Sequence, residues 1–134
     1  HTASLQRQHT AQLRQVRHQY LAYLASARKA LDDDDLIAAR DALAAARAID
    51  SADLGFVKLN EVYETRQQGQ IEQWLSEGSS LYRRGQFHQA RDLWQKVVAL
   101  DPNNTLAQAR LDRANRVIEK LERLRREQVA NQPD

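Results

Sequence analysis

Three groups of residues in this chain are of types that could take part in chemistry: an acidic run, four histidines and a row of arginines. The acidic run is Asp32 to Asp35. A calcium loop needs oxygen ligands at alternating positions, a glycine and a distant carboxylate, but the positions after this run carry apolar residues and an arginine. We therefore interpret the run as a solvated turn in which Asp34 or Asp35 caps the next helix.

The histidines do not form a metal-binding or catalytic pattern. His1, His9, His18 and His88 are never three or four residues apart, and no glutamate-rich zinc motif accompanies them. The chain has no cysteine, so disulfides, thiolate metal sites and a cysteine nucleophile are excluded. It also has no glycine-rich phosphate loop and no nucleophile elbow. The sequence therefore predicts a protein that is not an enzyme and that needs no cofactor or metal.

The arginines of the last predicted helix allow two interpretations. Arg110, Arg113 and Arg116 recur every three residues, and Lys120 and Arg123 follow them. Acidic residues are interleaved, so these side chains could form a solvated face with local ion pairs. They could instead bind an anionic partner. Nucleic acid is not the expected partner, because the net charge is only +2 and no aromatic residue lies near these arginines in the sequence.

Composition and periodicity predict an all-α protein. The chain has 134 residues with only four glycines and two prolines, and good helix formers dominate. We expect helices at 3–31, 35–50, 53–84, 86–100 and 104–128, and a disordered tail at 131–134. The helix at 53–84 is either one helix that bends near Gly69 or two helices broken at 68–70. No apolar run approaches the roughly 20 residues that span a bilayer.

The stretch 71–104 contains two apolar helical stripes that are separated by Gly85 and followed by Pro102. The first stripe is Ile71, Trp74, Leu75, Gly78, Leu81 and Tyr82, and the second is Phe87, Ala90, Leu93, Trp94, Val97 and Val98. This spacing resembles the tetratricopeptide repeat (TPR), a unit of two helices and about 34 residues. Gly78 and Ala90 are expected to face each other, so that the two helices approach closely. Glu77 and Val97 depart from the family pattern, which has leucine and alanine there.

Residues 20–53 form a degenerate second copy, because a shift of 51 residues places them on 71–104. Ala27 then falls on Gly78, Ala39 on Ala90, and Leu43 on Trp94. The resemblance implies one TPR-like domain over 1–134, with elongated first helices and five helices in a right-handed superhelical stack. The helix at 104–128 would close the last repeat. The expected core is Tyr20, Tyr23, Leu24, Leu43, Trp74, Leu81, Phe87, Trp94, Leu100, Leu111, Ile118 and Leu121.

The resemblance also implies a binding groove along the first helix of each repeat. Carried over by position, the groove contains Leu24, Arg28, Glu72, Leu75, Ser79, Tyr82, Arg83, Ala109, Arg110, Arg113 and Arg116. Such a basic groove suits an acidic peptide or one that ends in a carboxylate. Leu75 and Ser79 stand where the chaperone-binding branch has lysine and asparagine, which argues against that branch. We expect a non-catalytic scaffold module that binds a protein or peptide.

Two other functions remain open. The apolar seam from Leu111 to Leu124, together with the stretch from Phe56 to Tyr63, could pair two copies of the chain in a homo-oligomer. A weak nucleic-acid binder that uses the arginines of the last helix is the second alternative. The chain contains no methionine, so His1 does not start the reading frame. A removed leader with a lipid-attachment cysteine would place the protein in a bacterial cell envelope, periplasmic or lipid-anchored.

Overall fold

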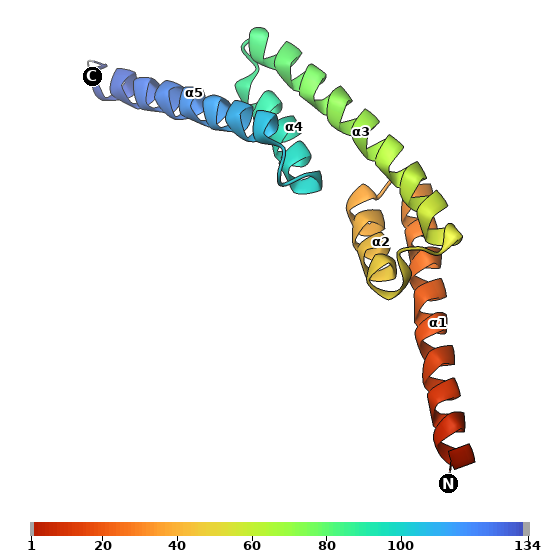
Figure 1. Cartoon of the computed structure of the whole chain (residues 1–134). Helices are drawn as coiled ribbons and strands as arrows, with labels where there is room; N and C mark the ends of the chain where they lie inside the picture. Colours follow the sequence, from red (N-terminus) through yellow and green to blue (C-terminus); the bar gives the residue numbers. More distant parts are fainter. Residues whose placement is uncertain (1, 133–134) are drawn as a thin grey trace. The chain divides into compact units, whose positions relative to one another are not determined.

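A computed structural model describes residues 2–132 and contains five α-helices within that range, with no strand (Figure 1). The helices are α1 (Thr2–Asp32), α2 (Leu36–Asp50), α3 (Leu54–Arg83), α4 (Phe87–Leu100) and α5 (Thr105–Ala130). The predicted all-α class is therefore confirmed. The right-handed superhelical stack remains a prediction.

The contacts of the chain divide it into two compact units, and the division falls inside α3. Within the described residues, unit 1 ends at Gln67 and unit 2 begins at Gln68. α3 is nevertheless one helix that runs through Gly69 without interruption, so the alternative of two helices broken at 68–70 is wrong. The first half of α3 belongs to unit 1 and its second half to unit 2.

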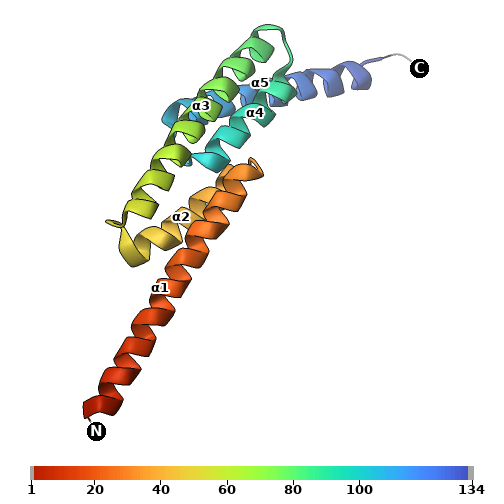
Figure 2. The ribbon, with the colours of Figure 1, turned by 90° about the vertical axis from the view of Figure 1, so that its right-hand side faces the viewer.

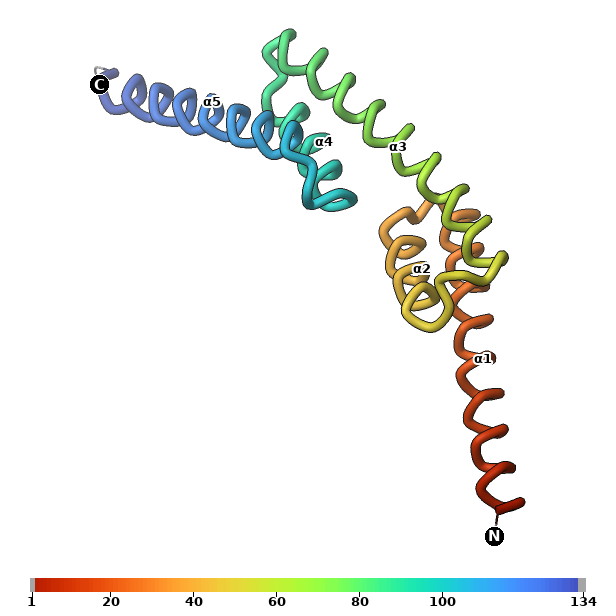
Figure 3. The backbone as a smooth tube through the Cα atoms, viewed as in Figure 1, coloured from red at the N-terminus to blue at the C-terminus, as the bar shows by residue number. Residues whose placement is uncertain are grey.

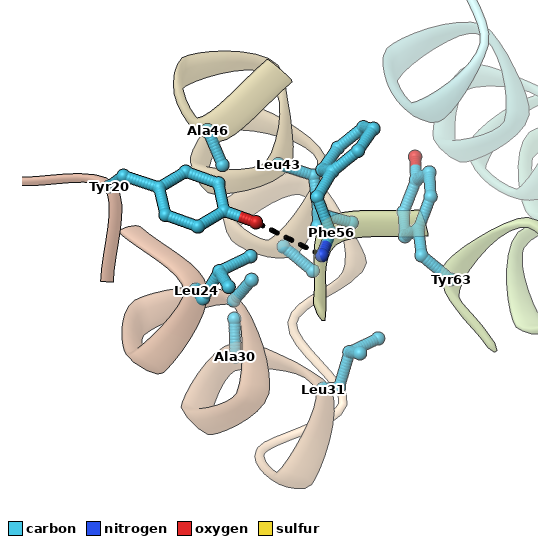
Figure 4. Close-up of a cluster of buried hydrophobic side chains, with 10 residues drawn as sticks. Tyr20, Leu24, Ala30, Leu31, Leu43, Ala46, Phe56 and Tyr63 are labelled. Atoms are coloured by element: carbon cyan, nitrogen blue, oxygen red, sulfur yellow. Dashed lines mark hydrogen bonds between the residues drawn. The ribbon is translucent and has the colours of Figure 1, made fainter. Parts of the chain in front are cut away.

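Unit 1 is built by the second half of α1, all of α2 and the first half of α3 (Figure 2). Its core takes one apolar face from each helix (Figure 4). These buried residues are Tyr20, Leu24, Ala27, Ala30, Leu31, Ala39, Leu43, Ala46, Phe56 and Tyr63. The Tyr20 hydroxyl donates a hydrogen bond to the Asp53 carboxylate and accepts one from the Phe56 backbone N–H at 3.1 Å. This buried hydroxyl therefore fixes the start of α3 against α1.

Unit 2 is built by the second half of α3, α4 and the first half of α5 (Figure 3). Trp94 of α4 is central, with only 2% of its surface exposed, and Ala90 and Ala114 pack around it. Its indole fills the space beside Gly78, where an added Cβ would lie 2.8 Å from Trp94 Cε2. The side chain that packs against Gly78 is therefore Trp94 of α4, and the predicted pairing of Gly78 with Ala90 stays a prediction.

The two hairpin turns have the same backbone structure at positions 51 residues apart. Asp34 has φ +56° and its counterpart Gly85 has φ +80°. The hydrogen bonds also correspond: the amides of residues 33, 34 and 35 bond to the carbonyls of 29, 31 and 30, and those of 84, 85 and 86 bond to the carbonyls of 80, 82 and 81. An aspartate thus takes the left-handed conformation that glycine takes in the second turn.

Several residues of the expected core are exposed or only half-buried. Tyr23 is 39% exposed and Leu121 is 49% exposed, so both predictions are wrong. Tyr23 lies beside the buried stripe of α1 rather than on it, and Leu121 lies in the second half of α5, where residues 119–130 are all exposed. Four further residues of that core are half-buried: Trp74, Leu81, Phe87 and Leu111. The remaining residues of the predicted core are buried.

Two helix halves extend from the units without covering partners among the described residues. Residues 2–19 of α1 are all exposed, as are residues 119–130 of α5. The apolar side chains on them include Leu5, Leu13, Val16, Leu121 and Leu124. The predicted disordered tail begins at the C-cap of α5, where the Asn131 backbone N–H donates to Glu127. Residues 133 and 134 of that tail, like residue 1, lie outside the described residues.

Candidate functional site

A pocket of about 310 Å³ opens in unit 2 between three helices. Its lining residues are Ser79, Tyr82 and Arg83 from α3, Trp94 from α4, and Arg110 and Arg113 from α5. Five of these six are among the eight binding residues predicted from the sequence, and Trp94 is the addition. The structure therefore brings five of the predicted residues of α3 and α5 together around one concavity.

Local helix geometry explains why these side chains converge. Tyr82 and Arg83 lie three and four residues after Ser79 at the end of α3, so both share the helix face of Ser79. Arg110 and Arg113 share a face near the start of α5 in the same way. The start of α5 is fixed by Asn104, whose side-chain oxygen accepts a hydrogen bond from the Ala107 N–H at 2.9 Å. An asparagine at this position is a favourable N-cap, because its side chain satisfies a backbone N–H that has no partner within the helix.

The inner wall of the pocket is aromatic. The Tyr82 ring packs edge-on against Phe87, with ring centroids 5.0 Å apart, and lies 5.8 Å from the Trp94 ring. The sequence places Tyr82 in the predicted groove but assigns Trp94 only to the core, so Trp94 is the part of this wall that was not predicted. Along the chain no aromatic residue lies near Arg110 and Arg113, but Tyr82 of α3 and Trp94 of α4 line the same pocket as these two arginines of α5.

One backbone carbonyl connects the aromatic wall to an arginine. The Leu75 carbonyl oxygen accepts a hydrogen bond from Trp94 Nε1 at 3.5 Å and another from Arg110 Nη1 at 3.4 Å. Leu75 therefore contributes its backbone, while its side chain packs against the unit 2 core. The bond restricts Arg110 to the side of the pocket that faces α3.

The arginines of the pocket have no acidic partners among the residues that the structure describes. Four other arginines, Arg17, Arg40, Arg66 and Arg91, form ion pairs with carboxylates. Arg83, Arg110 and Arg113 form none within 4.0 Å in this part of the chain. The Ser79 and Tyr82 side-chain hydroxyls likewise have no hydrogen-bond partner there. The pocket thus gathers three positive charges and two hydroxyl donors that are available to a ligand.

The other predicted groove residues do not line this pocket. Arg28 is exposed on α1 in unit 1, and Arg116 is exposed on α5 one turn beyond Arg113. Glu72 and Ala109 are also exposed but lie outside the lining. Leu24 is buried in the unit 1 core, so it cannot contact a ligand. The positions that the family pattern assigns to a groove therefore include core and outer-face positions in this chain.

The aspartate run and the apolar seam have structural roles. Asp35 caps α2 by accepting the Ala38 N–H at 3.0 Å, Asp34 pairs with Arg66, and Asp33 pairs with Lys29 at 3.2 Å. In the proposed seam, Ala114 and Ile118 are buried inside unit 2, and both ends of the stretch from Phe56 to Tyr63 are buried inside unit 1. Only the end of the seam, at Leu121 and Leu124, is exposed.

Comparisons with known protein families, with curated proteins and with solved structures found no match to this chain. Among residues 2–132, no helix is both long enough and apolar enough to cross a membrane.

Proposed function

We propose that this chain is a non-catalytic, TPR-like protein-interaction module that binds an acidic peptide segment of a partner protein. The observation that supports this proposal most directly is the pocket of unit 2, where Arg83, Arg110 and Arg113 lie without acidic partners beside Tyr82. Guanidinium groups bind carboxylates through two parallel hydrogen bonds, which gives both affinity and orientation. The aromatic wall offers contact area to an apolar side chain of the same peptide.

The rigidity of the pocket suits this role. Tyr82 is held by Phe87 and Trp94, and Arg110 is held by the Leu75 carbonyl. Because these groups are already positioned, a peptide that binds here loses its own conformational freedom but does not have to order the pocket. A nucleic-acid partner is less suitable, because the net charge of the chain is only +2, whereas nucleic-acid binders carry a larger excess of basic residues.

Two charge reversals on the same helix test the proposal. Arg113→Glu places a negative charge in the pocket, and Arg116→Glu makes the same change one turn away, outside the lining. We expect short fluorescein-labelled peptides rich in Asp and Glu to bind wild type and Arg116→Glu alike in fluorescence anisotropy. Arg113→Glu should weaken binding at least about tenfold, which is about 1.4 kcal/mol. Equal loss in both variants would mean that affinity follows overall charge, and no binding by wild type would remove the proposal.

A further inference from the structure

The number and placement of donors in the unit 2 pocket distinguish between anions. Three arginines and two residues with hydroxyl groups line it, and the polar groups of all five side chains can donate hydrogen bonds. A planar carboxylate has one charge and two oxygens, whereas a phosphoryl group on a side chain has nearly two charges and three acceptor oxygens. With three arginines around one pocket, the phosphoryl group satisfies more donors and neutralises more of the charge.

The arrangement of the donors favours a tetrahedral group in the same way. Arg83 comes from the end of α3, while Arg110 and Arg113 come from the start of α5, so the cations approach the pocket from two helices. Ser79 lies one helical turn before Arg83 on α3 and adds a neutral donor on that side. Oxygens that point in three directions can meet donors from both helices, whereas the two oxygens of a carboxylate lie in one plane.

The corresponding positions of unit 1 show that this charge is specific to unit 2. A shift of 51 residues places Leu59 at the position of Arg110, Val62 at that of Arg113, and Asp32 at that of Arg83. The backbone of the two turns is the same, so the helix framework alone does not produce a basic cluster. The cluster is a property of the side chains of unit 2.

We propose that the unit 2 pocket recognises a phosphorylated serine or threonine side chain in the partner peptide. This inference rests on the proposed function and names the group that the pocket selects. Arg83 and Arg113 would hold the phosphoryl oxygens from opposite helices, and Arg110 would complete the set from its position on the Leu75 carbonyl. The Tyr82 ring would contact the residue beside the phosphorylated one.

Small model ligands test the selection without knowledge of the partner sequence. The probes are N-acetyl-O-phosphoserine N-methylamide and N-acetylglutamate N-methylamide, titrated at equal ionic strength into ¹⁵N-labelled protein. The arginine Nε–H and the Trp94 Nε1–H resonances report binding, and the Trp74 indole serves as an internal reference. We expect the dissociation constant of the phosphoserine probe to be at least about fivefold lower than that of the glutamate probe.

Variants and a pH series test whether the probe binds at Arg113 through the charge of its phosphate. Arg113→Glu should raise the dissociation constant of the phosphoserine probe about tenfold or more, and Arg116→Glu should raise it less than about twofold. Arg113→Lys keeps the positive charge but loses the planar guanidinium group, so its affinity for the probe should lie between those of the two charge reversals. Because the second pKa of a phosphate ester is about 6, the preference over glutamate should shrink between about pH 7.5 and 5.5.

The outcomes separate this inference from the proposed function. Equal affinity for the two probes would overturn phosphoryl recognition, while the acidic-peptide test could still succeed. Equal affinity of wild type and Arg113→Glu for the phosphoserine probe would mean that the phosphate binds outside the unit 2 pocket. That result would also overturn phosphoryl recognition by this pocket. A single-stranded oligonucleotide that displaces the probe at lower concentration than a phosphopeptide would assign the site to nucleic acid instead. Failure of every anionic probe and of every acidic peptide would remove both proposals.

Discussion

Gly78 is the residue at which the packing of unit 2 has the least tolerance. A Cβ there would lie 2.8 Å from Cε2 and 2.9 Å from Cδ1 of the Trp94 indole. Trp94 cannot swing away, because it is buried and its Nε1 is hydrogen-bonded to the Leu75 carbonyl. We expect Gly78→Ala to lower the free energy of unfolding by about 1–2 kcal/mol, since overpacking outweighs the gain in helix propensity.

Gly69 provides the matched control for that substitution. It is also inside α3, but nothing lies within 4 Å of the place where a Cβ would be added. Gly69→Ala should therefore raise the free energy of unfolding by about 0.5–1 kcal/mol. Urea denaturation followed by circular dichroism compares the two variants. Opposite signs are expected, and a stabilising Gly78→Ala would contradict the close approach of Trp94 to α3.

Tyr20 connects stability to pH in unit 1. The hydrogen bond that its hydroxyl donates, together with the nearby Arg17 guanidinium, lowers the pKa of Asp53 below its ordinary value of 3.8. A carboxyl whose pKa is lower in the folded state contributes stability that is present above about pH 3.8 and that is lost as the pH falls through the lower folded value. Unit 1 should therefore lose stability towards acid partly through Asp53.

Tyr20→Phe tests this connection. The substitution removes the main cause of the lowered Asp53 pKa, so the decrease in stability below about pH 4 should become shallower. It also leaves the buried Phe56 N–H without its acceptor, which should cost about 1–2 kcal/mol at neutral pH. Urea unfolding at a series of pH values measures both effects. A parallel pH profile in the variant would show that the Asp53 pKa is set by other groups.

Among the elements, α3 is the one with two roles. Its first half completes the unit 1 core with Phe56 and Tyr63, and its second half opens unit 2 with Gly78 and Tyr82. Its length of 30 residues follows from this double role. The periodicity of apolar residues predicts the helix and its ends, because turns at 51–53 and 84–86 stop it. Periodicity cannot say which half packs with which neighbour, since that depends on contacts distant in sequence.

The N-cap residues of α2 and α4 have similar backbone angles but different side chains, which leads to a prediction about the stability of unit 2. Asp35 caps α2 with φ −93° and ψ 83°, and Gln86 occupies the equivalent place before α4 with φ −92° and ψ 70° but no side-chain bond. Gln86→Asp should supply the missing cap and stabilise unit 2 by about 0.5–1.5 kcal/mol. Asp35→Gln should destabilise unit 1 by a similar amount. Thermal unfolding of both variants measures this, and no gain from Gln86→Asp would mean that the backbone correspondence is incomplete.

At the scale of the whole molecule, the exposure of α5 leads to a prediction about the association of two copies. Ile118 is 5% exposed and belongs to the interior of unit 2, whereas Leu121 is 49% exposed. Leu121→Glu should leave the stability of unit 2 within about 0.5 kcal/mol of wild type, so it changes only the exposed end of the seam. Ile118→Glu should cost about 3 kcal/mol or more, because it buries a charge.

Sedimentation equilibrium of wild type and Leu121→Glu then tests whether two copies associate through the exposed end of α5. If the exposed end of α5 pairs two copies, the mass of wild type will exceed that of the variant. A monomer in both cases is expected from the structure, because most of the apolar seam is already covered inside the units. A dimeric wild type that Leu121→Glu converts to a monomer would support the oligomer hypothesis instead.

The sequence predicts most of the pocket lining of unit 2, whereas Leu24 and Arg28, its groove residues in unit 1, do not line this pocket. Ser79, Tyr82, Arg83, Arg110 and Arg113 lie at helical spacings on segments whose ends are fixed by Gly85 and Asn104, so their convergence follows from one hairpin and one further helix. Trp94 is buried as the sequence predicts, but that it also lines the pocket depends on contacts between helices and could not be read from the sequence. Leu24 shows the converse, since a position assigned to a groove is core in this chain.

The double role of α3 has a consequence for how such a chain could lengthen. Residue 105 occupies the same place in unit 2 that residue 54 occupies in unit 1, as the caps and turns 51 residues apart show. A gene in which the codons for 54–104 were duplicated in tandem would therefore encode a second 30-residue helix that begins where α5 now begins. That helix would finish one hairpin and start another, and no junction would need new loop sequence. A single tandem duplication would therefore add one hairpin to the chain without a new linker, because α3 belongs to both units.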